Sequence, residues 1–132
     1  MVGYRLKYFT FAPLYVILIL ILSSLDQNIV GAFSFGIKDF VLHAVEYNIL
    51  GVTLIWAFYR DKLPSEFRNS YLLAISTGSL IAILDEVYQA FVPTRFSTIE
   101  DVVADIFGLI LSVITFSLLM KIKPLENFRQ HA

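Results

Sequence analysis

The chain has 132 residues, of which 58% are hydrophobic and 16% are charged, and its formal net charge is -1. Soluble domains average roughly 45–50% hydrophobic and about 25% charged residues, so the composition excludes a disordered chain and is typical of a membrane protein. The balanced charge excludes nucleic-acid binding through a basic surface. Because there is no cysteine, disulfides, thiol nucleophiles and cysteine-ligated metals are also excluded. We expect residues 1–132 to form one integral membrane domain.

Four apolar segments are long enough to cross the hydrocarbon core of a bilayer, which takes roughly 20 helical residues each. They cover about residues 8–25, 40–59, 71–91 and 102–120. A spanning segment must satisfy its backbone hydrogen bonds internally, so each one is predicted to be a helix. The sequence therefore predicts an all-α membrane protein, a bundle of four transmembrane helices.

The lysines and arginines indicate how this bundle is oriented. Two of the ten, Lys38 and Arg95, lie in the connections after the first and third spans. The other eight lie on the opposite side: Arg5, Lys7, Arg60, Lys62, Arg68, Lys121, Lys123 and Arg129. Since cytoplasmic loops carry an excess of these residues, both termini are predicted to be cytoplasmic in a multi-pass plasma-membrane protein.

The segment that follows the first span contains small residues and aromatic residues. The small residues Val30, Gly31 and Ala32 resemble a signal-peptide cleavage site, but they lie too far beyond the apolar run, so we expect no cleavage. The connection over residues 26–39 contains several aromatic side chains, which are favoured at a membrane interface. We expect this connection to lie at the outer interface, and the sequence makes no prediction of its secondary structure.

Ionisable side chains lie in three of the four spans, although each costs roughly 2.5–3.5 kcal/mol at the centre of a helix. With the predicted orientation, all of them fall near the outer ends of their helices, roughly 5–10 Å deep at 1.5 Å per residue. The residues concerned are His43, Glu46, Asp85, Glu86 and Asp105. Side chains that share one depth on three helices predict an outward-facing polar pocket.

Helical spacing arranges these side chains along faces. In the second span, Asp39, His43 and Glu46 occupy positions i, i+4 and i+7, which lie on one stripe. In the fourth span, Asp101 and Asp105 are one turn apart and share a face. In the third span, Glu86 and Gln89 are three residues apart, so three helices offer polar stripes that can meet in one outward-facing pocket.

The start of the fourth span carries packing and capping signals as well. Gly108 continues the acidic face and permits close contact with another helix. Ser97 and Thr98 are expected to be N-cap residues rather than nucleophiles, and the spacing of Ser97 and Glu100 fits a capping box.

Three segments resemble, in order, the motifs of the VanZ-like family of membrane proteins. These segments are Asp39–Gly51, Asp85–Arg95 and Ser97–Gly108, and the resemblance covers about residues 38–112. It implies a four-helix protein of the bacterial cell envelope, in a family named for a protein that gives low-level resistance to the glycopeptide teicoplanin. The resemblance implies no established reaction, substrate or cofactor.

Two positions depart from the family's usual pattern. Phe40 stands where the family often has lysine, a role that Lys38 can take from the other side. Asp105 stands where the family often has asparagine, which adds a potential negative charge to the site.

One histidine among carboxylates, an arginine and a glutamine is suited to acid–base chemistry at a lipid head group. His43 titrates nearest neutrality, and the planar fork of Arg95 suits a phosphate or carboxylate oxygen. The candidate catalytic residues are His43, Glu46, Glu86 and Asp105, and the candidate substrate-binding residues are Asp39, Gln89, Arg95 and Asp101.

A divalent cation is a possible cofactor of this site. Crowded carboxylates oppose one another's ionisation unless a cation intervenes, and oxygen ligands favour Mg²⁺ or Ca²⁺ over Zn²⁺. The possible metal ligands are Asp85, Glu86, Asp101 and Asp105.

Three functions remain open, and the sequence does not decide whether the protein is an enzyme. The first is action on, or binding of, an anionic lipid head group or a polyprenyl-linked precursor of the cell envelope. The second is a small proton-coupled transporter, which would work as a homodimer because four helices enclose little space. The third is a non-catalytic protein that alters the envelope or binds another membrane protein.

Overall fold

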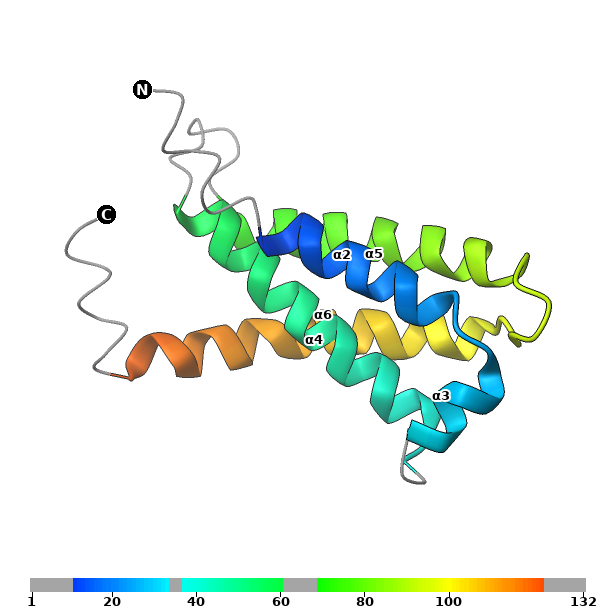
Figure 1. Cartoon of the computed structure of the whole chain (residues 1–132). Helices are drawn as coiled ribbons and strands as arrows, with labels where there is room; N and C mark the ends of the chain where they lie inside the picture. The colour runs from blue at the N-terminus through cyan, green and yellow to red at the C-terminus, as the bar shows by residue number, and fades with distance from the viewer. Residues whose placement is uncertain (1–10, 34–36, 61–68, 123–132) are drawn as a thin grey trace.

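The computed structural model describes residues 11–33, 37–60 and 69–122 (Figure 1). These residues form five helices: α2 (Phe11–Ser23), α3 (Gln27–Phe33), α4 (Asp39–Arg60), α5 (Ser70–Gln89) and α6 (Ile99–Lys121). The central pair is α4 and α6, against which α5 packs, while α2 contacts α4 and α5. The described part of the chain contains no strand, which confirms the predicted all-α class.

Three of these helices, α4, α5 and α6, are long and apolar enough to cross a membrane. Their ends lie within three residues of the predicted spans 40–59, 71–91 and 102–120. The first predicted span corresponds to α2, a shorter apolar helix of 13 residues. Residues 8–10 of that span and both ends of the chain lie outside the described residues, so the fourth crossing and the orientation stay predictions.

The helix α3 lies in the connection whose secondary structure the sequence left open. The side-chain Oδ1 of Asp26 accepts a hydrogen bond of 2.8 Å from the backbone N–H of Asn28, which is an N-cap interaction. The helix is only seven residues long, too short for an apolar periodicity to stand out in the sequence.

Glycines set the spacing between the long helices. A Cβ added to Gly108 of α6 would meet backbone atoms of Ala44 in α4. Similarly, a Cβ on Gly51 of α4 or on Gly78 of α5 would meet a side chain of α6. Helices in a bilayer associate largely through such close van der Waals contact, since lipid is as apolar as their side chains. The predicted role of Gly108 in close helix contact is confirmed.

Apolar packing fills most of the centre of the bundle, and the buried carboxylates lie toward one end. Tyr47, Leu50 and Ile55 of α4 are fully buried and belong to one cluster with Leu109 and Phe116 of α6. The outward faces of the same helices carry exposed valine, leucine and isoleucine, as expected where lipid surrounds them. The buried carboxylates Asp85, Glu86 and Asp105 lie outside this apolar cluster.

Candidate functional site

The polar residues predicted from the sequence come from elements that converge at one end of the bundle. The first turns of α4 and α6, the last turn of α5, and α3 lie toward the right of Figure 1. The connection between α5 and α6, which carries Arg95, closes this end.

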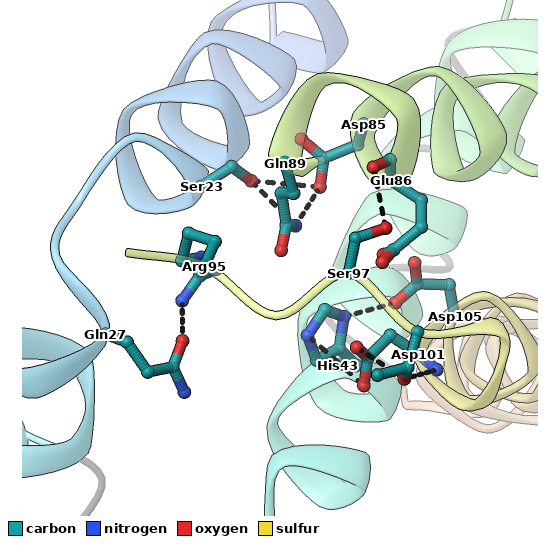
Figure 2. A network of polar contacts seen from close by, with 11 residues as sticks. Ser23, Gln27, His43, Asp85, Glu86, Gln89, Arg95, Ser97, Asp101 and Asp105 are labelled. Atoms are coloured by element: carbon teal, nitrogen blue, oxygen red, sulfur yellow. Dashed lines mark hydrogen bonds and ion pairs between the residues drawn. The ribbon is translucent and has the colours of Figure 1, made fainter. Parts of the chain in front are cut away.

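A histidine bound by two aspartates lies at the interface of α4 and α6 (Figure 2). Nδ1 of His43 is 2.9 Å from Oδ1 of Asp105, and Nε2 of His43 is 3.9 Å from Oδ1 of Asp101. The Asp105 side chain is 1% exposed, whereas that of His43 is 12% exposed. Asp105 thus fixes the ring from the buried side, and the second ring nitrogen faces Asp101 nearer the surface.

A second cluster joins α2 to α5. The hydroxyl of Ser23 donates a hydrogen bond of 2.9 Å to Oδ2 of Asp85, and Nε2 of Gln89 donates one of 3.0 Å to the same oxygen. All three side chains are buried. Asp85 therefore serves as an acceptor that holds two helices together.

The carboxylate of Glu86 faces a different direction from that of its neighbour Asp85. It is 7% exposed, neither of its oxygens has a hydrogen-bond partner among the described residues, and it points toward Asp105 (Figure 2). One buried oxygen each of Glu46 and Asp105 likewise has no partner in that part of the chain. Buried polar atoms are nearly always satisfied, so these oxygens indicate donors supplied from elsewhere.

Arg95 is oriented by a residue that the sequence analysis did not identify. A terminal nitrogen of its guanidinium donates a hydrogen bond of 2.9 Å to Oε1 of Gln27 in α3, while its Nε is buried without a partner in the described residues. Figure 2 shows this pair apart from the histidine cluster. Because α3 has no periodic signal, no sequence feature marked Gln27.

Several of these groups border one cavity of about 680 Å³. Six of the eight predicted catalytic and substrate-binding residues line it: Asp39, His43, Glu46, Gln89, Arg95 and Asp101. The two others, Glu86 and Asp105, are not part of the lining. The remaining wall is largely apolar and includes Leu25, Val41 and Val45. The cavity therefore combines a polar region with an apolar one.

The four possible metal ligands do not form a metal-binding cluster in the structure. Within residues 11–33, 37–60 and 69–122, no group of three or more His, Asp or Glu side chains is arranged to hold a metal ion. Asp85 faces α2, Asp101 and Asp105 face His43, and Glu86 lies between the two clusters (Figure 2). The function proposed below uses no metal.

The structure confirms one of the two N-cap residues predicted for α6. The N-cap is Thr98, whose hydroxyl accepts a hydrogen bond from the backbone N–H of Asp101 and donates one of 2.8 Å to Oδ2 of the same residue. The predicted pairing of Ser97 with Glu100 is therefore wrong. Ser97 instead donates to the backbone oxygen of Glu86, which ties the connection to the end of α5.

Comparison with known proteins identifies the family of the chain. The family model described as VanZ/LLP1 matches residues 11–120. No match was found among curated proteins or among solved structures. The family match covers all four predicted spans apart from residues 8–10, including every candidate site residue. The chain therefore belongs to the VanZ/LLP1 family.

Proposed function

We propose that the cavity binds the phosphate-bearing head group of a membrane lipid, either a phospholipid or a polyprenyl-linked envelope precursor, in the outer leaflet. The observation that carries this proposal is the amphipathic lining: six predicted site residues and an apolar wall border one space of about 680 Å³. That volume falls within the range of roughly 300–1,000 Å³ typical of small-molecule sites. An amphipathic ligand fits such a lining better than a wholly polar one.

Arg95 is the candidate phosphate ligand. Its Nε is buried without a partner among the described residues, and Gln27 already fixes the direction of the guanidinium. A guanidinium held in this way can give two parallel hydrogen bonds to phosphate oxygens. The preorganised side chain loses little conformational entropy when the ligand binds.

The acyl or prenyl chain of the ligand would lie along the apolar wall. Val41 and Val45 line the cavity and are also about half exposed on the outer face of α4. A hydrocarbon chain can therefore pass from the bilayer into the cavity without crossing water. His43 would then face the head group, where it can exchange a proton with the ligand.

The first prediction concerns which side of the membrane the cavity faces. The chain has no cysteine, so a single introduced cysteine reports its own accessibility. Phe96→Cys lies in the α5–α6 connection, where the native side chain is 82% exposed, and Lys121→Cys lies at the opposite end of α6. We expect a membrane-impermeant maleimide to label F96C in intact cells and K121C only after permeabilisation. The reverse pattern would place the cavity on the cytoplasmic side.

The second prediction concerns phosphate binding. Arg95→Gln is expected to weaken phospholipid binding by about tenfold or more, since hydrogen bonds to a charged group contribute roughly 1.5–3 kcal/mol. Native mass spectrometry of the purified full chain in detergent measures the bound lipid directly. The matched control is Arg60→Gln at the far end of α4, where the arginine lies over the Trp56 ring. Equal binding by R95Q and R60Q would contradict the assignment of Arg95.

The link to antibiotic resistance is supported by the family alone. Cells that carry the wild-type chain are expected to tolerate more teicoplanin than cells that carry R95Q at equal expression. A change in resistance without a change in lipid binding would show that resistance does not depend on lipid binding by the cavity.

A further inference from the structure

The cavity lining carries more carboxylates than cations. Among the described residues, its acidic members are Asp39, Glu46, Glu100 and Asp101, and its one guanidinium belongs to Arg95. In the same part of the chain, these carboxylates form no ion pair with a lysine or an arginine. Oδ1 of Asp101 lies 3.9 Å from Nε2 of His43, and its Oδ2 accepts a hydrogen bond from the hydroxyl of Thr98. A head group with negative charge alone would be repelled by most of this lining.

This end of the bundle also has hydrogen-bond acceptors, in the cavity lining and behind it, that no described residue satisfies. Oε1 of Glu46, on the face of α4 that borders the cavity, is buried without a partner. Behind His43, the carboxylate of Glu86 is more than nine-tenths buried, has no partner on either oxygen and points toward Asp105 (Figure 2). Ionised carboxylates only accept hydrogen bonds, so this end of the bundle needs N–H donors as well as positive charge.

We propose, building on the function proposed above, that the head group carries a primary ammonium beside its phosphate. The phosphate binds Arg95, and the ammonium binds the carboxylates of Glu46 and Asp101. These residues border the same cavity, with Arg95 on one side and the His43–Asp101 pair on the other in Figure 2. The head group is thus zwitterionic: its negative phosphate pairs with Arg95, and its positive ammonium pairs with the carboxylates.

A primary ammonium suits these oxygens better than the other cations available. It has three N–H donors that can reach separate carboxylates. A quaternary ammonium has none and would leave the Glu46 oxygen unpaired. A metal ion needs a converging ligand set, and the described residues contain no such group.

Two kinds of lipid carry this chemistry: aminophospholipids and polyprenyl phosphates that bear an amino sugar. Native mass spectrometry of the full chain in detergent can compare phosphatidylethanolamine, its N-methylated derivatives, phosphatidylcholine and phosphatidylglycerol. Parallel samples contain polyprenyl phosphate with and without an amino sugar. We expect the amine-bearing lipid to bind about tenfold more tightly than phosphatidylglycerol, with the preference declining as N–H groups are replaced by methyl groups.

Glu46→Gln is the variant that tests the ammonium site. It keeps the shape of the side chain and removes its charge, so it should reduce the preference for amine-bearing lipids to near parity with phosphatidylglycerol. The control Asp26→Asn removes a charge near the start of α3 and outside the lining, and should leave the preference unchanged. If E46Q is unstable in a thermal melt, Asp101→Asn supplies the same test.

The outcomes separate this inference from the proposed function. If the wild type binds all phospholipids equally and R95Q loses them, the ammonium site is wrong and the phosphate site stands. If E46Q and D101N both keep the amine preference, the assignment to these carboxylates is overturned. If the wild type binds no lipid, the proposed function fails, and this inference fails with it.

Discussion

Gly108→Ala is expected to destabilise the protein by about 2–3 kcal/mol, the upper part of the range for overpacked cores. Alanine favours a helix over glycine by roughly 1 kcal/mol, so the substitution would stabilise the protein unless the contact at this position opposed it. The added Cβ would meet the backbone of Ala44, which cannot move aside as a flexible side chain can. The two helices must therefore separate, which would also strain the hydrogen bond from Asn48 to the backbone oxygen of Gly108.

The matched control for this substitution is Gly31→Ala in α3. Nothing lies within 4 Å of a Cβ added at Gly31, so this change should be neutral or slightly stabilising. The free energy of unfolding in mixed micelles, measured by denaturing-detergent titration, compares the two variants. Equal stability of G108A and G31A would show that α4 and α6 are not in the contact described above.

His43→Leu is expected to cost about 3–5 kcal/mol, because it leaves the Asp105 carboxylate buried and unpaired. Nδ1 of His43 is the hydrogen-bond partner of Asp105 among the described residues. The double variant His43→Leu, Asp105→Leu removes both polar groups and should be more stable than the sum of the single effects predicts. A double-mutant cycle on the free energy of unfolding gives the coupling energy, and strict additivity would contradict the pairing.

Because His43 and Asp105 depend on each other, a test of the chemistry of His43 needs a substitution that keeps the hydrogen bond to Asp105. A loss of activity in H43L would report unfolding as readily as a missing acid or base. His43→Asn keeps an N–H that can donate to Asp105 and removes the titratable ring, so we expect it to remain folded. Comparative lipidomics of membranes with the wild type or H43N then separates an enzyme, which changes a lipid species, from a binding protein.

The sequence predicted the stripes of the site, because helical spacing is a local property. The separation of Asp101 and Asp105 by one turn directs both toward one neighbour, and the structure shows that this neighbour is His43. The pairing itself depends on the close approach of α4 and α6 at Gly108 and Ala44. The sequence identified the small residue but not the helix that would meet it.

The different roles of Asp85 and Glu86 could not be predicted in the same way. Adjacent residues on a helix point about 100° apart, so one faces α2 and the other faces α6. Which of the two residues faces α2 depends on the position of α2, and residue spacing within α5 does not predict that position. Gln27 was missed for a related reason: its partner Arg95 is far away in sequence, and both lie outside the long periodic helices.

The apolar wall of the cavity determines which concentration of the ligand governs occupancy of the site. Val41 and Val45 border the cavity and the outer face of α4 at once, so a lipid would enter from the bilayer rather than from water. Its occupancy would then depend on its mole fraction among competing lipids in the leaflet. A lipid that makes up about one tenth of the leaflet would half-fill the cavity with a preference of only about tenfold, or about 1.4 kcal/mol. A modest number of well-placed polar contacts would therefore suffice for selective occupancy.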